Sequence, residues 1–362
     1  MKESYVSYYK PYINHIDRDN NMGLIRYLLA FGVLIGHFNI ICGTDIPWIV
    51  SSNNRVGGFF ALSGFVLTGS LLKGISFNDF VKKRAWRILP SYFFVVICAS
   101  ILLCFVSSYS FQEYYLDSGF WKYLAANLSF MNWLHPGLPG VFQENEITAV
   151  NGSLWTMKVE WQLSLSAPLM IYLCYKYKWN LRKTIIVIIS VAMVYRLGFQ
   201  YMYQKTSDAI YEILGRQFFY QSLFFYCGML IYTYYNLFIK YRWYLAIVSV
   251  VIYITGWLFI TSEFYYFVLQ PFSITFMVLS LSLLPKDIGS LLDKGQNISY
   301  EIFLCHFPVI QLIIEFDLID KFGIASTLTI VITATVALAL ITYYTVGNLY
   351  IRRKTKLVRQ TA

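Results

Sequence analysis

Long apolar runs, separated by short charged loops, constrain this chain more than any other feature. We distinguish about ten such runs, and each suits a helix that crosses a hydrocarbon layer of roughly 30 Å. Lipid offers no hydrogen bonds to an exposed backbone, so helices are the structure expected of them. The sequence therefore predicts an all-α, polytopic integral membrane protein with about ten transmembrane helices. The runs lie at roughly 22–41, 56–72, 88–107, 160–175, 184–203, 217–236, 243–260, 264–284, 298–314 and 326–348.

The composition points the same way. Of the 362 residues, 57% are hydrophobic and 13% are charged, whereas an ordinary soluble domain carries about 25% charged residues. A net charge of +10 in a soluble protein would suggest nucleic acid as a partner. In a membrane protein, lysine and arginine mark the cytoplasmic loops instead. We therefore expect the lipid bilayer and no nucleic acid as a partner.

The distribution of basic residues predicts the topology. With the amino terminus inside, most of the 29 lysines and arginines fall in inside segments, and each inside loop is at least as basic as its outside neighbours. The positive-inside rule then places both termini in the cytoplasm. We expect three parts: a cytoplasmic segment at 1–21, a membrane domain at 22–350 and a cytoplasmic basic tail at 351–362. The longest loop, 108–159, would lie outside, and a loop of that length is more often functional than idle.

The termini and the cysteines narrow the possibilities further. The polar first 21 residues lack the charged, apolar and small-residue pattern of a signal peptide. The six cysteines are scattered and form no CxxC pair or cluster with histidine. We therefore expect neither a metal site nor a disulfide framework.

Two ionisable residues share the first apolar run. Arg26 and His37 are eleven positions apart, which places them within about 20° on one helical face and roughly 16 Å apart along the axis. Ionisable groups within membrane helices mark functional sites by default. Histidine, with an unperturbed pKa of about 6.5, is suited to take a proton from a hydroxyl group. The alternatives are a snorkelling arginine and a hydrogen-bonded structural histidine.

A second polar cluster precedes the third run. Arg84 and Arg87 are three positions apart and are neighbours on a helical face. Paired guanidinium groups suit a phosphate-rich cytoplasmic ligand, of which coenzyme A is an example. The alternative is an ordinary basic anchor of the positive-inside kind.

Two further stretches carry polar residues into apolar runs. Glu160 lies where the outer loop meets the fourth run, and either pairs with His37, binds substrate hydroxyls or interacts with a helix dipole. Glu301 and His306 lie in the ninth run. Pro308 follows them and frees the carbonyl four residues earlier. This stretch is either functional or a kinked packing helix with a hydrogen-bonded histidine.

These stretches together resemble the acyltransferase family 3 of membrane proteins. The resemblance covers residues 20 to 350 in the order of the family's motifs. The matching motifs are Arg-x10-His at Arg26 and His37, FFxLSGF at Phe59–Phe65, Arg-x-x-Arg at Arg84 and Arg87, LWTxxxE at Leu154–Glu160, and SYxxYLxH at Ser299–His306.

The resemblance implies an enzyme of the cytoplasmic (inner) membrane, with O-acylation of a cell-surface polysaccharide or its lipid-linked precursor as its reaction. It implies acetyl-CoA as the usual donor and a glycan as the acceptor. On this basis we expect catalytic roles for His37, Arg26 and Glu160 and donor binding by Arg84 and Arg87. Residues expected to contact substrate are Trp155, Ser63, Tyr300 and His306.

The family pattern is not matched everywhere. Gln162 and Leu163 replace residues that are more often bulky or aromatic, and Cys305 stands where an aromatic residue usually precedes the histidine. These departures concern the identity of the acceptor more than the chemistry. Polar residues in helices also suit a transporter or flippase, and a glycan polymerase shares the high apolar content. No internal repeat of the kind that many transporters show is visible.

Overall fold

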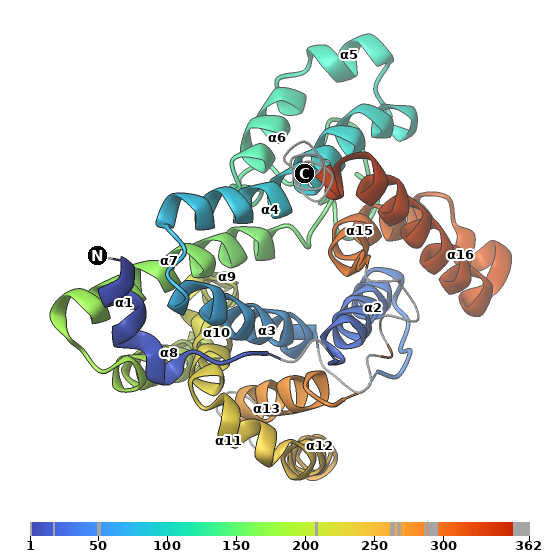
Figure 1. Ribbon diagram of the computed structural model, residues 1–362. Coiled ribbons are helices and arrows are strands. Elements are labelled where there is room, and N and C mark those ends of the chain that lie inside the picture. The colour runs from blue at the N-terminus through green and yellow to red at the C-terminus, as the bar shows by residue number, and fades with distance from the viewer. Residues whose placement is uncertain are drawn as a thin grey trace. The chain divides into compact units, whose positions relative to one another are not determined.

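The part of the chain that the structure describes is mainly helical. The computed structural model describes residues 2–16, 19–48, 52–206, 209–260, 265, 269–285, 288 and 296–349 (Figure 1). These residues contain no strand, so the all-α prediction is confirmed. The predicted basic tail, 351–362, lies outside the described residues. The helices in the first part of the chain are α1 (Lys2–Tyr9), η1 (Lys10–Tyr12), α2 (Met22–Cys42), α3 (Ser52–Leu72), α4 (Phe77–Leu102), η2 (Leu103–Val106), α5 (Phe111–Leu116) and α6 (Ser118–Leu128).

The second part of the chain is equally helical. Its helices are α7 (Trp155–Tyr177), α8 (Leu181–Thr206), α9 (Ala209–Gly215), α10 (Phe218–Thr233), α11 (Tyr235–Lys240), α12 (Arg242–Phe259), α13 (Gln270–Ser282), α15 (Ser299–Glu315), α16 (Leu318–Thr342) and the π-helical η4 (Tyr343–Gly347).

Among the residues that the structure describes, six helices are long and apolar enough to cross a membrane. They are α2, the 55–72 part of α3, α4 with η2, α8, α12, and α16 with η4. The other four predicted runs fall on α7, α10, α13 and α15. Of these, α10, α13 and α15 have 16, 13 and 17 residues, fewer than the roughly 20 that a full crossing needs. The chain is a multi-pass membrane protein, while the count of ten crossings and the cytoplasmic termini stay predictions.

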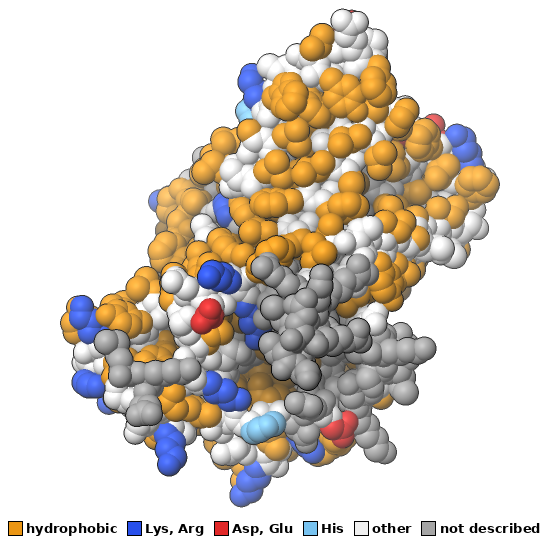
Figure 2. All heavy atoms as spheres, turned by 45° about the horizontal axis from the view of Figure 1, so that its top comes forward, with side chains coloured by type: hydrophobic (Ala, Val, Ile, Leu, Met, Phe, Trp, Pro, Cys, Tyr) orange, Lys and Arg blue, Asp and Glu red, His pale blue; other side chains and the backbone are white. Residues whose placement is uncertain are grey.

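The outward surfaces of the long helices are apolar. Val194 on α8 and Phe259 on α12 are 70% and 77% exposed. Hydrophobic side chains also dominate the face drawn in Figure 2. An exposed apolar surface of this extent is costly in water and favourable in lipid. The surface therefore agrees with the membrane location that the composition predicts.

The described chain divides into two compact units. Unit 1 comprises residues 1–29, 49–80 and 159–296, and unit 2 comprises residues 30–48, 81–158 and 297–362. Helices α2, α4 and α7 therefore each contribute residues to both units.

Unit 1 is built around close contact between α3 and α10, which lie side by side in Figure 1. A Cβ atom added at Gly64 would lie 2.0 Å from the carbonyl oxygen of Phe225, and one added at Gly228 would lie 2.0 Å from that of Ala61. Glycine at these positions lets the two backbones touch. The FFxLSGF motif thus contributes a packing surface as well as Ser63.

A buried arginine in unit 1 has a structural explanation. Arg196 on α8 is 4% exposed, and its Nη1 atom donates to the carbonyl oxygen of Tyr220 at 3.1 Å. Its guanidinium group also lies 3.8 Å from the centroid of the Tyr220 ring. A membrane arginine is tolerated when carbonyl and aromatic partners replace water in this way.

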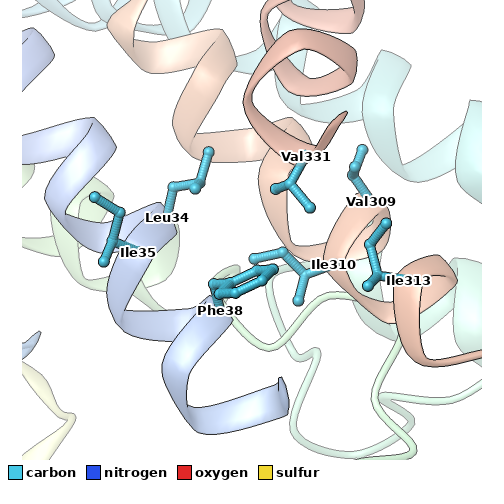
Figure 3. Packing of buried hydrophobic residues seen from close by; sticks show 7 residues of the cluster. All are labelled: Leu34, Ile35, Phe38, Val309, Ile310, Ile313 and Val331. Atoms are coloured by element: carbon cyan, nitrogen blue, oxygen red, sulfur yellow. The ribbon is translucent and has the colours of Figure 1, made fainter. Parts of the chain in front are cut away.

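Unit 2 contains the apolar core that supports the candidate site (Figure 3). Leu34, Ile35 and Phe38 of α2 form one cluster with residues of α15 and α16. The contributors from these two helices are Val309, Ile310, Ile313 and Val331. The α2 residues flank His37, and the first α15 residues follow His306 closely. Burial of these side chains therefore sets the two histidine-bearing segments against each other.

Candidate active site

The centre of the site in unit 2 is a pair of histidines. The Nδ1 atom of His37 lies 2.7 Å from the Nε2 atom of His306. The ring centroids are 5.0 Å apart and the ring planes are inclined by 18°. A centroid separation so much longer than the N···N distance means that the rings meet edge to edge. The contact is therefore a hydrogen bond between the two rings that lies close to both ring planes, and its N···N distance is that of a normal hydrogen bond.

Aromatic rings enclose this pair. His306 is completely buried and His37 is partly buried. The ring of Phe307 lies edge-on to His37 at 5.1 Å, and the Phe303 ring is 5.7 Å from His306. His306 also has its Nδ1 atom 3.3 Å from the carbonyl oxygen of Ile302, one helical turn earlier. The apolar surroundings strengthen each polar contact, because the local dielectric constant is low.

The long loop between α4 and α7 holds the turn of α15 that carries His306. Pro308 has no N–H group, so the carbonyl of Leu304 loses its helical partner. Asn151 supplies a replacement, because its Nδ2 atom donates to the Leu304 oxygen at 2.9 Å. A Cβ atom added at Gly152 would lie 2.7 Å from the Phe307 ring, so glycine allows the loop to approach this closely. The stretch before the LWTxxxE motif therefore anchors the histidine-bearing turn.

A second loop contact lies further along α15. Gln311 is completely buried, and its Nε2 atom donates to the carbonyl oxygens of Ile147 and Ala149, the latter at 2.8 Å. Asn145 donates to the side-chain oxygen of Gln311 at 3.2 Å. A glutamine amide that bonds backbone groups in this way satisfies polar atoms that burial would otherwise leave costly.

The first turn of α15 contacts α4 next to the arginine pair. The Tyr300 hydroxyl donates to the carbonyl oxygen of Ile88 at 3.0 Å, the residue that follows Arg87. Ser91 donates to the Glu301 carboxylate at 2.9 Å. A Cβ atom at Gly347 would lie 2.7 Å from the same carboxylate oxygen. The structure thus brings the SYxxYLxH and Arg-x-x-Arg motifs together at neighbouring turns of α15 and α4.

The two arginines of α4 differ in exposure. Arg87 is exposed and Arg84 is partly buried. Lys82 and Lys83, just before them on the same helix, are both exposed. Guanidinium groups three positions apart can hold phosphate oxygens bidentately, which ammonium groups cannot.

Two other predicted site residues meet in unit 1. Ser63 of α3 donates to the Glu160 carboxylate of α7 at 2.6 Å, a short charge-assisted hydrogen bond. This contact joins the FFxLSGF and LWTxxxE motifs. The predicted partnership of Glu160 with His37 involves residues of different units and stays a prediction.

The remaining predicted residues lie on the helices expected for them. Arg26 and His37 both lie on α2, as their spacing predicted, and both are partly buried. Trp155 is the first residue of α7 and is partly buried. Within the described residues, no three side chains of histidine, cysteine, aspartate or glutamate gather into a cluster that could hold a metal ion. The chemistry that this arrangement supports is proton transfer by the His37 imidazole.

Three residues that support the site were not predicted from the sequence. Asn145, Asn151 and Gln311 were not singled out, although one signal pointed to Asn151. The carbonyl freed by Pro308 needs a donor, because buried backbone groups are almost always paired. An amide side chain such as that of Asn151 can supply this donor.

Comparison with known proteins agrees with the motifs. The family profile described as "Acyltransferase domain" matches residues 19–345. A protein of Shigella phage Sf6 described as "O-acetyl transferase" is 24% identical over 147 residues, which cover 40% of this chain and 43% of that protein. The match thus spans less than half of the relative's length. No solved structure matches the chain. Because the family match includes every helix that carries the site, the chain belongs to the acyltransferase 3 family.

Proposed function

We propose that this acyltransferase moves an acetyl group from acetyl-CoA to a sugar hydroxyl of a cell-surface polysaccharide or of its lipid-linked precursor. The observation that carries the proposal is the 2.7 Å contact between His37 and His306 inside the family's matched region. A partly buried imidazole that is fixed by a second ring is suited to proton transfer. The family assignment favours an enzyme over a transporter, a flippase or a glycan polymerase. The inner membrane is the proposed location.

The donor would be bound by the arginine pair. Arg84 and Arg87 would hold the phosphates of coenzyme A through forked hydrogen bonds. Arg26 would either hold phosphate oxygens or stabilise the negative charge that develops on the thioester oxygen. The exposure of Arg87 supports this role, since a ligand from water can reach it.

The reaction moves one acyl group from sulfur to the sugar oxygen and one proton from the sugar hydroxyl to the coenzyme A sulfur. His37 takes the proton of the sugar hydroxyl while the sugar oxygen forms a bond to the acyl carbon. The carbon–sulfur bond then breaks, and the coenzyme A thiolate receives the proton. A covalent acyl-histidine is the variant of this route. Glu160 would bind a hydroxyl group of the acceptor, and Trp155, Ser63 and Tyr300 would contact the acceptor.

Acetyl transfer into a glycan tests the reaction. Membranes containing wild-type protein, His37→Ala or His15→Ala would be incubated with radiolabelled acetyl-CoA and a crude glycan fraction. His15 is exposed and near the amino terminus, so His15→Ala is a matched histidine control. We expect label in the glycan with wild type and His15→Ala and none with His37→Ala. Normal labelling by His37→Ala at equal protein amount would overturn the proposed role of His37.

Donor binding is tested separately. Arg87→Gln should weaken acetyl-CoA binding by about tenfold or more, because a hydrogen bond to a charged group contributes about 1.5–3 kcal/mol. Lys83→Gln removes the same charge from the same exposed turn and should have a much smaller effect. Equal losses in the two variants would show that the segment attracts the donor by charge alone.

A further inference from the structure

The His37–His306 contact raises a question that the proposed function leaves open, namely which nitrogen of His37 carries a proton. The question matters because a neutral imidazole has one N–H group and one lone pair. Only the nitrogen with the lone pair can act as a base. The hydrogen bonds of the His306 ring determine which nitrogen of His37 has the lone pair.

The backbone carbonyl of Ile302 determines the state of His306. A carbonyl oxygen can only accept, and it lies 3.3 Å from His306 Nδ1. This nitrogen must therefore carry the proton, since the opposite tautomer would set a lone pair against the carbonyl oxygen. The Nε2 atom of neutral His306 then has the lone pair and is an acceptor.

The protonation of His306 determines that of His37. Its Nδ1 atom is 2.7 Å from an acceptor nitrogen, so Nδ1 of His37 carries the proton and donates. The lone pair of neutral His37 is left on Nε2. We propose that His306 is a positioning residue, which fixes His37 in the Nδ1–H tautomer and so makes Nε2 of His37 the base. The role of Nε2 as a base rests on the proposed function. The tautomer of His37 rests on the geometry alone.

The surroundings of the pair support a fixed tautomer. His306 is completely buried, so water does not compete for its Nε2 atom. Phe303 and Phe307 limit ring rotation. Asn151 holds the Leu304 carbonyl of the same turn, so the loop and the helix together set the position of His306. A carboxylate commonly orients a catalytic histidine, and here a second, neutral imidazole fills that place.

When Nε2 of His37 takes the hydroxyl proton, both nitrogens of the ring carry protons. Nδ1 continues to donate to His306, so the contact is kept through the step and no proton needs to move onto His306. The Ile302 carbonyl holds the other proton of His306 in place. His306, which we expected from the sequence to contact substrate, thus orients His37 instead and stabilises its protonated form.

Nitrogen NMR tests the tautomer directly. The protein has four histidines, so selective ¹⁵N-histidine labelling gives few signals, and His37→Gln and His306→Gln assign them. At a pH where the imidazoles are neutral, we expect Nδ1 of His37 to be protonated and Nε2 to be unprotonated in the wild type. A His37 signal from the Nε2–H tautomer would overturn the inference.

Substitutions of His306 test the consequence for catalysis. His306→Gln can place an amide oxygen where Nε2 was and should keep the turnover rate within a few-fold. His306→Leu removes the acceptor and should lower kcat by about 100-fold, with KM for acetyl-CoA unchanged. Cys305→Ala, one residue earlier and also buried, controls for packing of α15. Equal kcat values for the Gln and Leu variants would overturn the positioning role.

The two ideas can fail separately. If wild-type protein transfers no acetyl group but His37 shows the expected tautomer, the proposed function fails and the pairing stands. If wild-type protein transfers acetyl groups and His37 is the Nε2–H tautomer, the function stands and the positioning role fails. Should His306→Leu not fold, the NMR result on the wild type decides alone.

Discussion

Unit 1 and unit 2 are each stabilised internally by a different kind of contact. In unit 1, α3 and α10 touch through glycines, and the backbones themselves form the contact. In unit 2, the Asn151 amide of the loop between α4 and α7 holds the turn of α15 that carries His306, and Asn145 of the same loop contacts Gln311 further along α15. The first region depends on shape, since any added atom meets a backbone oxygen. The second depends on pairing each polar group, so it should tolerate changes in volume better than the loss of a donor.

The glycine contact should give the largest effect on stability. Gly64→Ala adds a Cβ atom 2.0 Å from the Phe225 carbonyl oxygen, which forces α3 and α10 apart. Overpacking of this kind costs about 3 kcal/mol. Gly198→Ala is the control, because a Cβ atom there meets nothing within 4 Å and alanine favours the helix by about 1 kcal/mol. Thermal unfolding in detergent should move in opposite directions for the two variants. If both lower the midpoint equally, the contact is not decisive.

The amide contact should come next. Asn151→Leu keeps much of the volume but leaves the Leu304 carbonyl without its donor, which costs about 1–3 kcal/mol. In a Pro308→Ala background, the restored N–H group can bond that carbonyl, so Asn151→Leu should cost less there. A double-mutant cycle measured by unfolding gives the coupling. Additive effects would show that Asn151 and Pro308 act independently.

The hydrogen bond between Ser63 and Glu160 should contribute less. Ser63→Ala removes a 2.6 Å contact to the carboxylate, but both side chains are partly exposed, so we expect a loss of about 1 kcal/mol. Glu160→Gln keeps an acceptor for Ser63 and should be nearly as stable as the wild type. Acetyl transfer by Glu160→Gln, compared at equal protein amount, then reports the role of the charge. Full activity of this variant would remove Glu160 from the mechanism.

The smallest effect concerns the exposed start of α5. Ser110 and Glu113 form a reciprocal cap, and the hydrogen bonds from Ser110 lower the pKa of the Glu113 carboxyl below its ordinary value of 4.5. Because the folded pKa is depressed, the stabilisation is complete above that value and is lost as the pH falls through the lower one. Hydrogen exchange of the α5 amides should speed up in this acidic range. Ser110→Ala should speed it up already at neutral pH, and unchanged exchange would show that the cap is not formed.

The sequence predicted the helices better than the contacts between them. Apolar runs gave the helical segments, and the eleven-residue spacing put Arg26 and His37 on one helix, α2. The pairing of His37 with His306 was not predictable, since periodicity within one helix says nothing about the residue facing it on another. The apolar runs did not predict where each helix ends: α7 begins at Trp155 and ends at Tyr177, beyond both ends of the predicted run at 160–175.

Some contacts were within reach of sequence reasoning. Pro308 implied an unpaired carbonyl, which Asn151 fills. The glycine of the FFxLSGF motif was noted only as part of a family pattern. The close approach to Phe225 that requires it depends on where α10 lies, and no local pattern contains that information.

The bond from Asn151 to the Leu304 carbonyl has a consequence for protein engineering. The long loop between α4 and α7 is a segment that could be exchanged between relatives. A transplanted loop must bring its own amide donor for the proline-bearing turn, or the host helix must lose its proline. The loop and α15 should therefore be exchanged together. Chimaeras that take the loop from one protein and α15 from another should express poorly.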